Sequence, residues 1–309
     1  MKLALVDILI TSFVRTFVAV LSVLPERLAI RCALGFVQLG IRFTPRYRAV
    51  AARNLELIFP EKSKEEHERI FQGSLRVLAR NLQLFAIMPT LKREQLEQMF
   101  DYTAAREKLK ELNEKGAGAG LLILTLHYGC FELLVQAHSC LWKPTNILAR
   151  DFGLPRLDRY WWGRRQHFGS RVFSRSGGYR EIVTRLRAGE DVAVLFDQNV
   201  KASHASFVDF FGIKAATTRA PAVAALRGKS PVVVTVTVEV APNKFEVLFE
   251  EVPSPAIGEG TNEERIAAFL EHTHRVAERF IRLHPEQWFW IHRRFKTRPA
   301  GEPENMYSV

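Results

Sequence analysis

Apolar residues recur along the chain at two different spacings, which predict two kinds of element. From Ser63 to about Glu114 they recur every three or four positions, and Ser63 to Glu66 has the spacing of a helix capping box. Beyond Gly116 the pattern changes to short apolar runs that predict buried strands. These runs occupy residues 121–126, 145–150, 171–174, 192–196, 232–239 and 245–249.

Helical patterns separate most of the predicted strands. They lie at residues 131–141, 155–167, 178–188 and 216–228, and another covers residues 262–283. Strands that alternate with helices are typical of α/β proteins, in which the strands run mostly parallel. We therefore predict an α/β fold with a mixed, mostly parallel central sheet covered by helices.

The first segment, residues 3–24, holds 16 apolar positions and is interrupted by Asp7 and Arg15. A membrane helix needs about 20 apolar residues, and each charge at the bilayer centre would cost about 2.5–3.5 kcal/mol. Asp7 and Arg15 lie near the same helical face, so the opposite face stays apolar. We expect a membrane-associating helical segment at residues 1–45, which either spans imperfectly or lies in the interface, and an α/β domain at residues 46–309. A buried core helix is the alternative.

The charge balance points to an anionic partner. The formal net charge is +11, from 44 Lys and Arg against 33 Asp and Glu, which favours nucleic acid, an anionic membrane surface or a phosphorylated substrate. Residues 150–187 contain ten arginines and no lysine, with aromatic residues between them. Guanidinium groups bind phosphate through a planar fork, but proteins that bind single-stranded nucleic acid use the same residue types. Composition leaves these alternatives open.

The sequence lacks the motifs of common metal and nucleotide sites. Its three cysteines, Cys32, Cys130 and Cys140, do not have zinc-ligand spacing and cannot all pair with one another, which favours a reducing compartment. The histidines form no HExxH motif, and there is neither a GxGxxG sequence nor a Walker loop. We therefore expect no metal and no bound cofactor.

The strongest candidate for chemistry follows the predicted strand at residues 121–126. His127 comes directly after the strand, Gly129 permits a tight turn, and Glu132 lies at the start of the next helix. Across such a corner a carboxylate can fold back onto the imidazole and fix its tautomer, so that the other ring nitrogen can take a proton from a hydroxyl. The alternative is an ordinary polar corner with a capping glutamate. Cys130 is a weaker candidate, because small thiols are commonly buried.

A second polar cluster follows the predicted strand at residues 192–196. Asp197, Gln198 and Asn199 could position a substrate or brace neighbouring loops, although Asp and Asn are also common in turns. Parallel strands gather such groups at their carboxyl ends. Alone, this cluster does not identify a function.

His127-x4-Glu132 after an apolar strand resembles the H-x4-D/E signature of glycerolipid and glycolipid acyltransferases. Further motifs spread over about residues 50–299 resemble, in their order, the bacterial lipid A late acyltransferase family, which adds secondary lauroyl or myristoyl chains. These motifs are Arg53–Pro60, Arg175–Arg180, Asp197-Gln198, Phe207–Gly212, Ala215–Thr218 and Pro285–Pro299.

This resemblance implies a glycerolipid-acyltransferase-like fold at the cytoplasmic face of the inner membrane. It implies an acyl carrier protein thioester as donor and co-substrate, a phosphorylated glycolipid (a lipid A precursor) as acceptor, an anionic membrane surface as a further partner, and no nucleic acid. It implies His127 as general base and Glu132 as the carboxylate that orients it. The substrate-binding residues that it implies are Arg164, Arg165, Arg175, Asp197 and Gln198.

Four alternatives to this interpretation stay open. The first is an acyltransferase that acts on a phospholipid or another glycolipid, and the second is a thioesterase that uses the same dyad. The third belongs to a different class: a basic protein that binds nucleic acid, which would explain the charge of +11. The fourth is a non-catalytic membrane scaffold, which would tolerate loss of His127.

Overall fold

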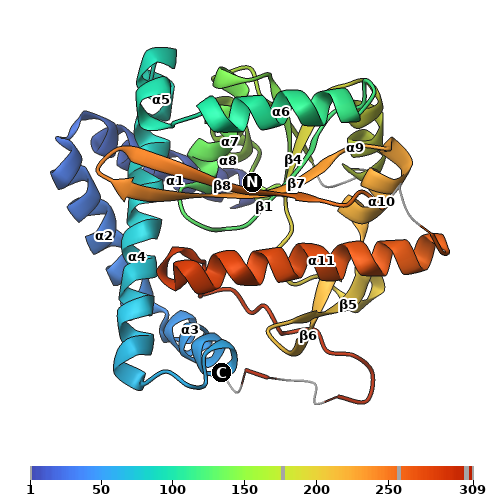
Figure 1. Cartoon of the computed structure of the whole chain (residues 1–309). Coiled ribbons are helices and arrows are strands. Elements are labelled where there is room, and N and C mark those ends of the chain that lie inside the picture. The colour runs from blue at the N-terminus through green and yellow to red at the C-terminus, as the bar shows by residue number, and fades with distance from the viewer. Residues whose placement is uncertain (1, 175–177, 256–258, 303–305, 308–309) are drawn as a thin grey trace.

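The computed structural model describes residues 2–174, 178–255, 259–302 and 306–307. A central sheet is formed by β1 (Leu122–Thr125), β2 (Thr145–Ala149), β3 (Arg171–Ser174), β4 (Asp191–Leu195), β7 (Val232–Ala241) and β8 (Lys244–Val252). Within the described residues these six strands lie in the order β3-β2-β4-β1-β7-β8 (Figure 1).

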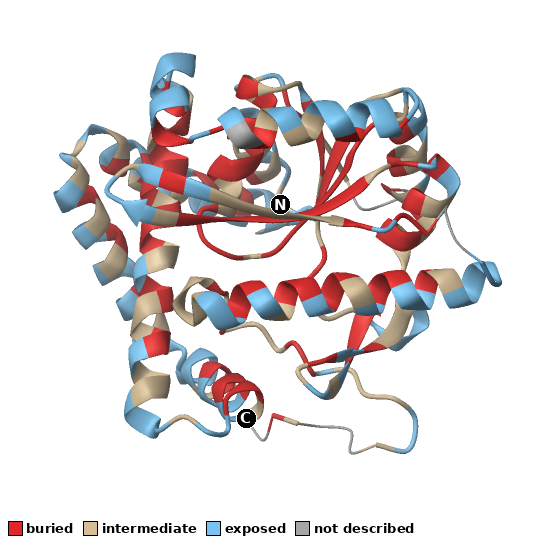
Figure 2. Cartoon of the chain, viewed as in Figure 1, coloured by how far each residue is buried: buried red, intermediate tan, exposed pale blue. Residues whose placement is uncertain are grey.

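The sheet is mixed and mostly parallel, which confirms the predicted fold class. β1 pairs in parallel with β4 and β7, and β2 pairs in parallel with β3 and β4, while β8 runs antiparallel to β7. β1 is therefore an interior strand. Each residue of its Leu-Ile-Leu-Thr sequence is buried, as expected for a parallel strand covered on both faces (Figure 2).

Helices cover both faces of the sheet (Figure 1). The helices that follow or precede its strands are α6 (Thr103–Lys115), α7 (Phe131–Leu141), α8 (Pro155–Arg165), α9 (Gly178–Arg187), α10 (Ala220–Gly228) and α11 (Asn262–Leu283). On one face, residues of α6 and α7 share a hydrophobic core with Ile123 of β1. On the other face, residues of α9, α10 and α11 share a core with Leu124. The alternation of side chains along one strand thus builds two separate cores.

An antiparallel hairpin, β5 (Ala205–Phe210) and β6 (Ile213–Thr218), lies beside α11. Sequence patterning predicted a helix over residues 216–228, and the first part of that prediction is wrong. Thr217 and Thr218 pair with β5, because β-branched side chains fit a strand better than a helix. The helix starts at Ala220, with a proline in its first turn.

The chain forms helices from Lys2 to Met99. They are α1 (Lys2–Val23), α2 (Glu26–Phe43), α3 (Pro45–Ile58), α4 (Lys64–Ile87) and α5 (Arg93–Met99), with a short 3₁₀ helix at Met88–Thr90. Two further 3₁₀ helices lie later in the chain, at Ala202–His204 and Pro285–Gln287. The predicted capping box begins α4: Ser63 accepts from the backbone of Glu66, whose side chain accepts from Ser63 N–H. Buried residues of α1 and α2 share a hydrophobic core with α4 and α7. A boundary near residue 45 stays a prediction.

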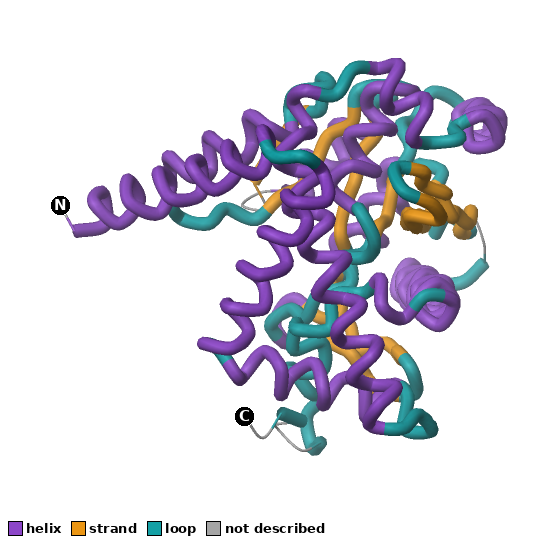
Figure 3. Tube along the Cα trace, turned by 90° about the vertical axis from the view of Figure 1, so that its left-hand side faces the viewer, coloured by secondary structure: helices purple, strands orange, loops and turns teal. Residues whose placement is uncertain are grey.

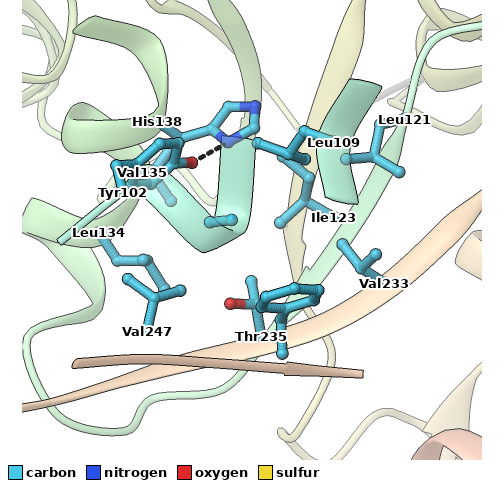
Figure 4. A pocket seen from close by; sticks show the side chains of 12 residues that line it. Tyr102, Leu109, Leu121, Ile123, Leu134, Val135, His138, Val233, Thr235 and Val247 are labelled. Carbon is cyan, nitrogen blue, oxygen red and sulfur yellow. Dashed lines mark hydrogen bonds between the residues drawn. The ribbon is translucent and has the colours of Figure 1, made fainter. Parts of the chain in front are cut away.

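α1 projects from the rest of the molecule (Figure 3) and exposes most of its apolar side chains. Leu3, Leu9 and Phe13 are 79%, 61% and 57% exposed. From Leu3 to Val23 the helix is long and apolar enough to cross a membrane by length and composition. It is therefore not the buried core helix that was the alternative interpretation, and it fits a membrane anchor.

Candidate active site

The two polar clusters expected from the sequence meet at one edge of the sheet. β1 and β4 are neighbouring parallel strands, and Thr125 lies opposite Leu195. His127 and Asp197 each follow these paired residues by two positions, so the chain brings them together where the strands end. Parallel strands in α/β folds form ligand sites at this edge.

Asp197 holds the imidazole of His127 through two contacts. Its Oδ1 lies 2.8 Å from His127 Nδ1, and its Oδ2 accepts from the His127 backbone N–H at 2.9 Å. The indole N–H of Trp288 donates to the same Oδ2 at 2.9 Å. Burial by itself would raise the pKa of Asp197, but the charge and hydrogen bonds of His127 and the bond from Trp288 outweigh it and lower this pKa to about 2. Asp197 is therefore an ionised acceptor at neutral pH.

This contact assigns the two ring nitrogens of His127 different roles. With Nδ1–H donating to the carboxylate, Nε2 carries the lone pair that can accept a proton. The side-chain amide of Gln198 lies 3.2 Å from Nε2 and can donate to it. The side chain of His127 is 22% exposed, so Nε2 is on a ring that other molecules can reach. Nε2 is therefore positioned to act as a general base, like the free ring nitrogen of a histidine that a carboxylate orients in other enzymes.

Glu132 has a different partner from the one expected from the sequence. Its two carboxylate oxygens accept from Nε and Nη2 of Arg165 at 2.9 and 2.5 Å, and both side chains are about 15% exposed or less. Among the described contacts of Glu132 there is no hydrogen bond to His127. The expectation that Glu132 orients the imidazole is therefore not met in this structure. Asp197 takes that place because the pairing of β1 with β4 brings it there directly, whereas Glu132 faces α8.

Arg164 and Arg165 point to different parts of the fold. Arg164 donates to the carbonyl oxygens of Phe85 and Ala86, at distances from 2.5 to 3.2 Å, at the end of α4. Its guanidinium also lies 5.1 Å from the centre of the Phe85 ring. Arg164 thus joins α8 to α4, Arg165 joins α8 to α7, and their binding of substrate stays a prediction. Arg175 lies outside the described residues.

The turn after His127 is fixed by its backbone. Gly129 has φ +53°, its N–H donates to the carbonyl of Gln287 at 2.9 Å, and its carbonyl accepts from Asn81 Nδ2 at 2.6 Å. A Cβ atom at Gly129 would lie 1.8 Å from the carbonyl oxygen of Thr237. The tight turn predicted at Gly129 is confirmed, and it needs glycine for both its φ angle and its close approach to β7.

Gly129→Ala is therefore expected to destabilise the fold by about 4 kcal/mol or more, since the methyl group requires the turn and β7 to separate. Gly153→Ala is the matched control, because Gly153 has φ +74° and open space around its Cβ position. The control isolates the cost of the positive φ, about 1–2 kcal/mol. Urea unfolding of both variants measures the difference. Equal losses for the two would contradict the packing assigned to Gly129.

Cys130 does not fit a nucleophile. The side chain is buried, and burial raises the pKa of the thiol far above its ordinary value, so that it stays protonated. In the described part of the chain, no group of three or more His, Cys, Asp or Glu side chains is arranged to hold a metal ion.

Trp288 is a member of this site that the sequence alone does not indicate. It belongs to the Pro285–Pro299 segment, whose sequence resembles a family motif but predicts none of its contacts. The segment returns to the carboxyl ends of the strands, where Gln287 also holds Gly129. The Trp, His and Arg residues of this segment form no local pattern that predicts which carboxylate Trp288 contacts.

A model of the family described as bacterial lipid A biosynthesis acyltransferase matches residues 1–297. The chain belongs to this family. A lipid A biosynthesis palmitoleoyltransferase of Escherichia coli (strain K12) is 27% identical over 268 residues, which cover 84% of this chain and 82% of that protein. The match places the chain among acyltransferases, in agreement with the resemblance carried by its motifs.

Two further relatives come from the same organism. A lipid A biosynthesis lauroyltransferase is 25% identical over 286 residues, 91% of this chain and 89% of its own length. A lipid A biosynthesis myristoyltransferase is 26% identical over 272 residues, 82% of this chain and 77% of its own. The relatives are named for different acyl chains and resemble this chain to a similar degree, so identity alone does not select a chain length.

Proposed function

We propose that this protein transfers a fatty acyl chain from an acyl carrier protein thioester to a hydroxyl group of a phosphorylated glycolipid in lipid A biosynthesis. Membership of the lipid A acyltransferase family supports the reaction class. The observation that carries the mechanism is the contact of 2.8 Å between His127 Nδ1 and the buried carboxylate of Asp197. It leaves Nε2 of a partly exposed imidazole as a base at the end of β1.

In the proposed step, Nε2 of His127 takes the proton of the acceptor hydroxyl while the hydroxyl oxygen attacks the thioester carbonyl carbon. The C–O bond forms and gives a tetrahedral oxyanion. When this intermediate collapses, the C–S bond breaks and the leaving thiolate takes the proton from the imidazolium. The products are an ester and a free thiol, with no acyl-enzyme intermediate. Asp197 keeps the ring oriented and stabilises the imidazolium while it exists.

Glu132 has a positioning role in this proposal. Its paired hydrogen bonds to Arg165 connect the first turn of α7 to the end of α8. That connection holds in place the corner on which His127 lies, because α7 begins at Phe131 and the Phe131 ring packs 5.2 Å from the imidazole. Glu132 thus supports the geometry of the base without touching it.

Gln198 is proposed to donate a hydrogen bond beside the reacting atoms. Its amide lies next to Nε2, so it must yield this position to the acceptor hydroxyl and can then face the developing oxyanion. Gln198→Leu keeps a similar volume and removes the donor. We expect kcat to fall roughly tenfold or more, with an unchanged unfolding midpoint. A full wild-type kcat in Gln198→Leu would remove Gln198 from the reaction.

The partners follow from the charges and the exposed apolar helix. An acyl carrier protein and a phosphorylated acceptor are both anionic, which suits the net charge of +11. The exposed apolar residues of α1 suit a membrane, and we propose the cytoplasmic face of the inner membrane as the location. A lipid acceptor would reach the site from that surface.

Mass spectrometry of lipid A from cells with and without the gene tests this function. The proposal predicts that cells without the gene accumulate lipid A that lacks an ester-linked acyl chain, and that the wild-type gene restores it. Rescue by a His127→Ala gene should fail. Identical lipid A in the presence and absence of the gene would refute lipid A as the acceptor.

A further inference from the structure

A groove of about 480 Å³ separates the anchor helix α1 from α8. Its lining residues come from both helices: Ile8, Thr11, Ser12, Arg15, Arg156, Arg159 and Tyr160. This lining contains three guanidinium groups, two hydroxyl groups from Ser and Thr, one phenol and no carboxylate. The groove is thus a positively charged site between the apolar helix and the body of the protein.

Asp7 fixes the position of α1 against α8. Its carboxylate is buried and accepts from the backbone N–H groups of Arg156 and Leu157 at 3.1 and 3.4 Å, and from Thr11 Oγ1 at 3.1 Å. It therefore caps the first turn of α8 from a different helix. Ile8, Ser12 and Arg15 form the adjacent stripe of α1 at helical spacing, so they line the groove because Asp7 is docked.

The arginines of the groove have little neutralisation. Arg156 has Asp7 as an ion-pair partner at 3.5 Å, and that carboxylate already accepts other hydrogen bonds. Among the residues that the structure describes, no carboxylate lies within ion-pair distance of Arg15 or Arg159. Arg15 instead lies 5.6 Å from the centre of the Tyr160 ring, which directs it toward α8. These guanidinium groups are free to bind an anion.

We propose that this groove binds the phosphate of an anionic membrane lipid, as a site separate from the acyl-transfer centre. Guanidinium groups recognise phosphate through paired hydrogen bonds, and Ser12 adds a hydroxyl donor, whereas the Thr11 hydroxyl already donates to Asp7. The exposed residues Leu5, Leu9 and Phe13 of α1 give the lipid chains an apolar surface beside the groove. An acidic protein partner would satisfy the arginines but would leave this apolar surface in water, so a lipid is the better fit.

The site has a structural consequence for α8. α8 begins beside the groove at Pro155 and ends at Arg165, which donates a hydrogen bond to Glu132. Arg156 and Arg165 are nine residues apart, about 13 Å along the helix. A lipid phosphate that joins Arg15 of α1 to Arg159 of α8 would hold α8 at the membrane surface, with its far end in contact with the catalytic corner.

The test uses the full-length chain in neutral detergent micelles that contain a small fraction of phosphatidylglycerol or, in a second arm, phosphatidylcholine. Lipid that stays with the chain after gel filtration is counted by mass spectrometry over a titration, with no acyl donor or acceptor present. Arg15→Gln/Arg159→Gln is compared with Arg69→Gln/Arg275→Gln, which removes the same charge from exposed positions on α4 and α11. Arg15→Lys/Arg159→Lys keeps the charge but loses the planar fork.

We expect Arg15→Gln/Arg159→Gln to raise the half-saturating phosphatidylglycerol concentration roughly tenfold, with a smaller rise for the lysine variant and none for Arg69→Gln/Arg275→Gln. Phosphatidylcholine should bind weakly to all of them. Equal losses in the two glutamine variants would refute the site, because bulk charge would then explain the binding. Displacement of the lipid by an equal concentration of inorganic phosphate would refute a lipid site. This binding assay contains no acyl donor or acceptor. Its result therefore does not depend on whether the protein proves to be an acyltransferase.

Discussion

His127→Ala is expected to lower the rate of acyl transfer about 10³-fold, because it removes the group that accepts the hydroxyl proton. Asp197→Asn is expected to produce a loss of similar size. An amide in the place of Asp197 can present its NH₂ group to Nδ1, which favours the tautomer with the proton on Nε2 and leaves no lone pair there. Steady-state kinetics with a purified acyl carrier protein thioester and a phosphorylated glycolipid measure both effects.

The control for these two variants is a measurement that each one is still folded. His127→Ala removes one partner of the buried Asp197 carboxylate but leaves the donors at the residue 127 backbone and at Trp288, so the variant should melt at a lower temperature than the wild type and still be folded under assay conditions, which circular dichroism melting curves check. Asp197→Asn keeps the shape of a buried side chain that accepts from Trp288. Wild-type turnover in either correctly folded variant would refute the pair as the catalytic base and its positioning residue.

The second large effect concerns Glu132, and here stability is expected to change more than chemistry. Glu132→Gln leaves the nearly buried guanidinium of Arg165 without a counter-ion, and loss of one partner of such a pair costs about 3–5 kcal/mol. The double variant Glu132→Gln/Arg165→Met removes the unpaired charge and should recover much of this loss. Urea unfolding of the wild type, both single variants and the double variant gives the coupling energy.

The same variants separate two roles for Glu132. If Glu132 is a positioning residue, the rate per folded molecule of the double variant should fall far less than that of His127→Ala. If Glu132 acts on the imidazole directly, the double variant should be stable and as inactive as His127→Ala. That second outcome would restore the dyad that the sequence predicted and would contradict the role assigned to Asp197.

Local sequence patterns predicted the parts of the site that depend on one stretch of chain. The apolar run before His127 predicted a buried strand, and Gly129 predicted the tight turn. Both predictions depend on residues within a few positions of each other, where periodicity and backbone preference are informative. The position of Asp197 after a strand was also predicted, but not its contact with His127.

The partner of His127 depends on strand order, which the sequence did not reveal. Asp197 meets the imidazole because β4 lies next to β1 in the sheet, although the two residues are 70 positions apart in the chain. Glu132 was favoured because it is close in sequence, and proximity along the chain does not choose between two carboxylates across a corner. The partners of Arg164 and Arg165 could not be predicted for the same reason, because they lie on other helices, α4 and α7.

With His127 as the base, the acyl chain is expected to pass directly from the thioester to the lipid hydroxyl. Mass spectrometry of a reaction that contains the purified chain, acyl carrier protein thioester and phosphorylated glycolipid tests it most directly. We expect one new ester on the glycolipid, an unmodified protein mass throughout, and no free fatty acid when the glycolipid is omitted. Fatty acid release at an equal rate without the glycolipid, or an acyl group that accumulates on the protein, would contradict it.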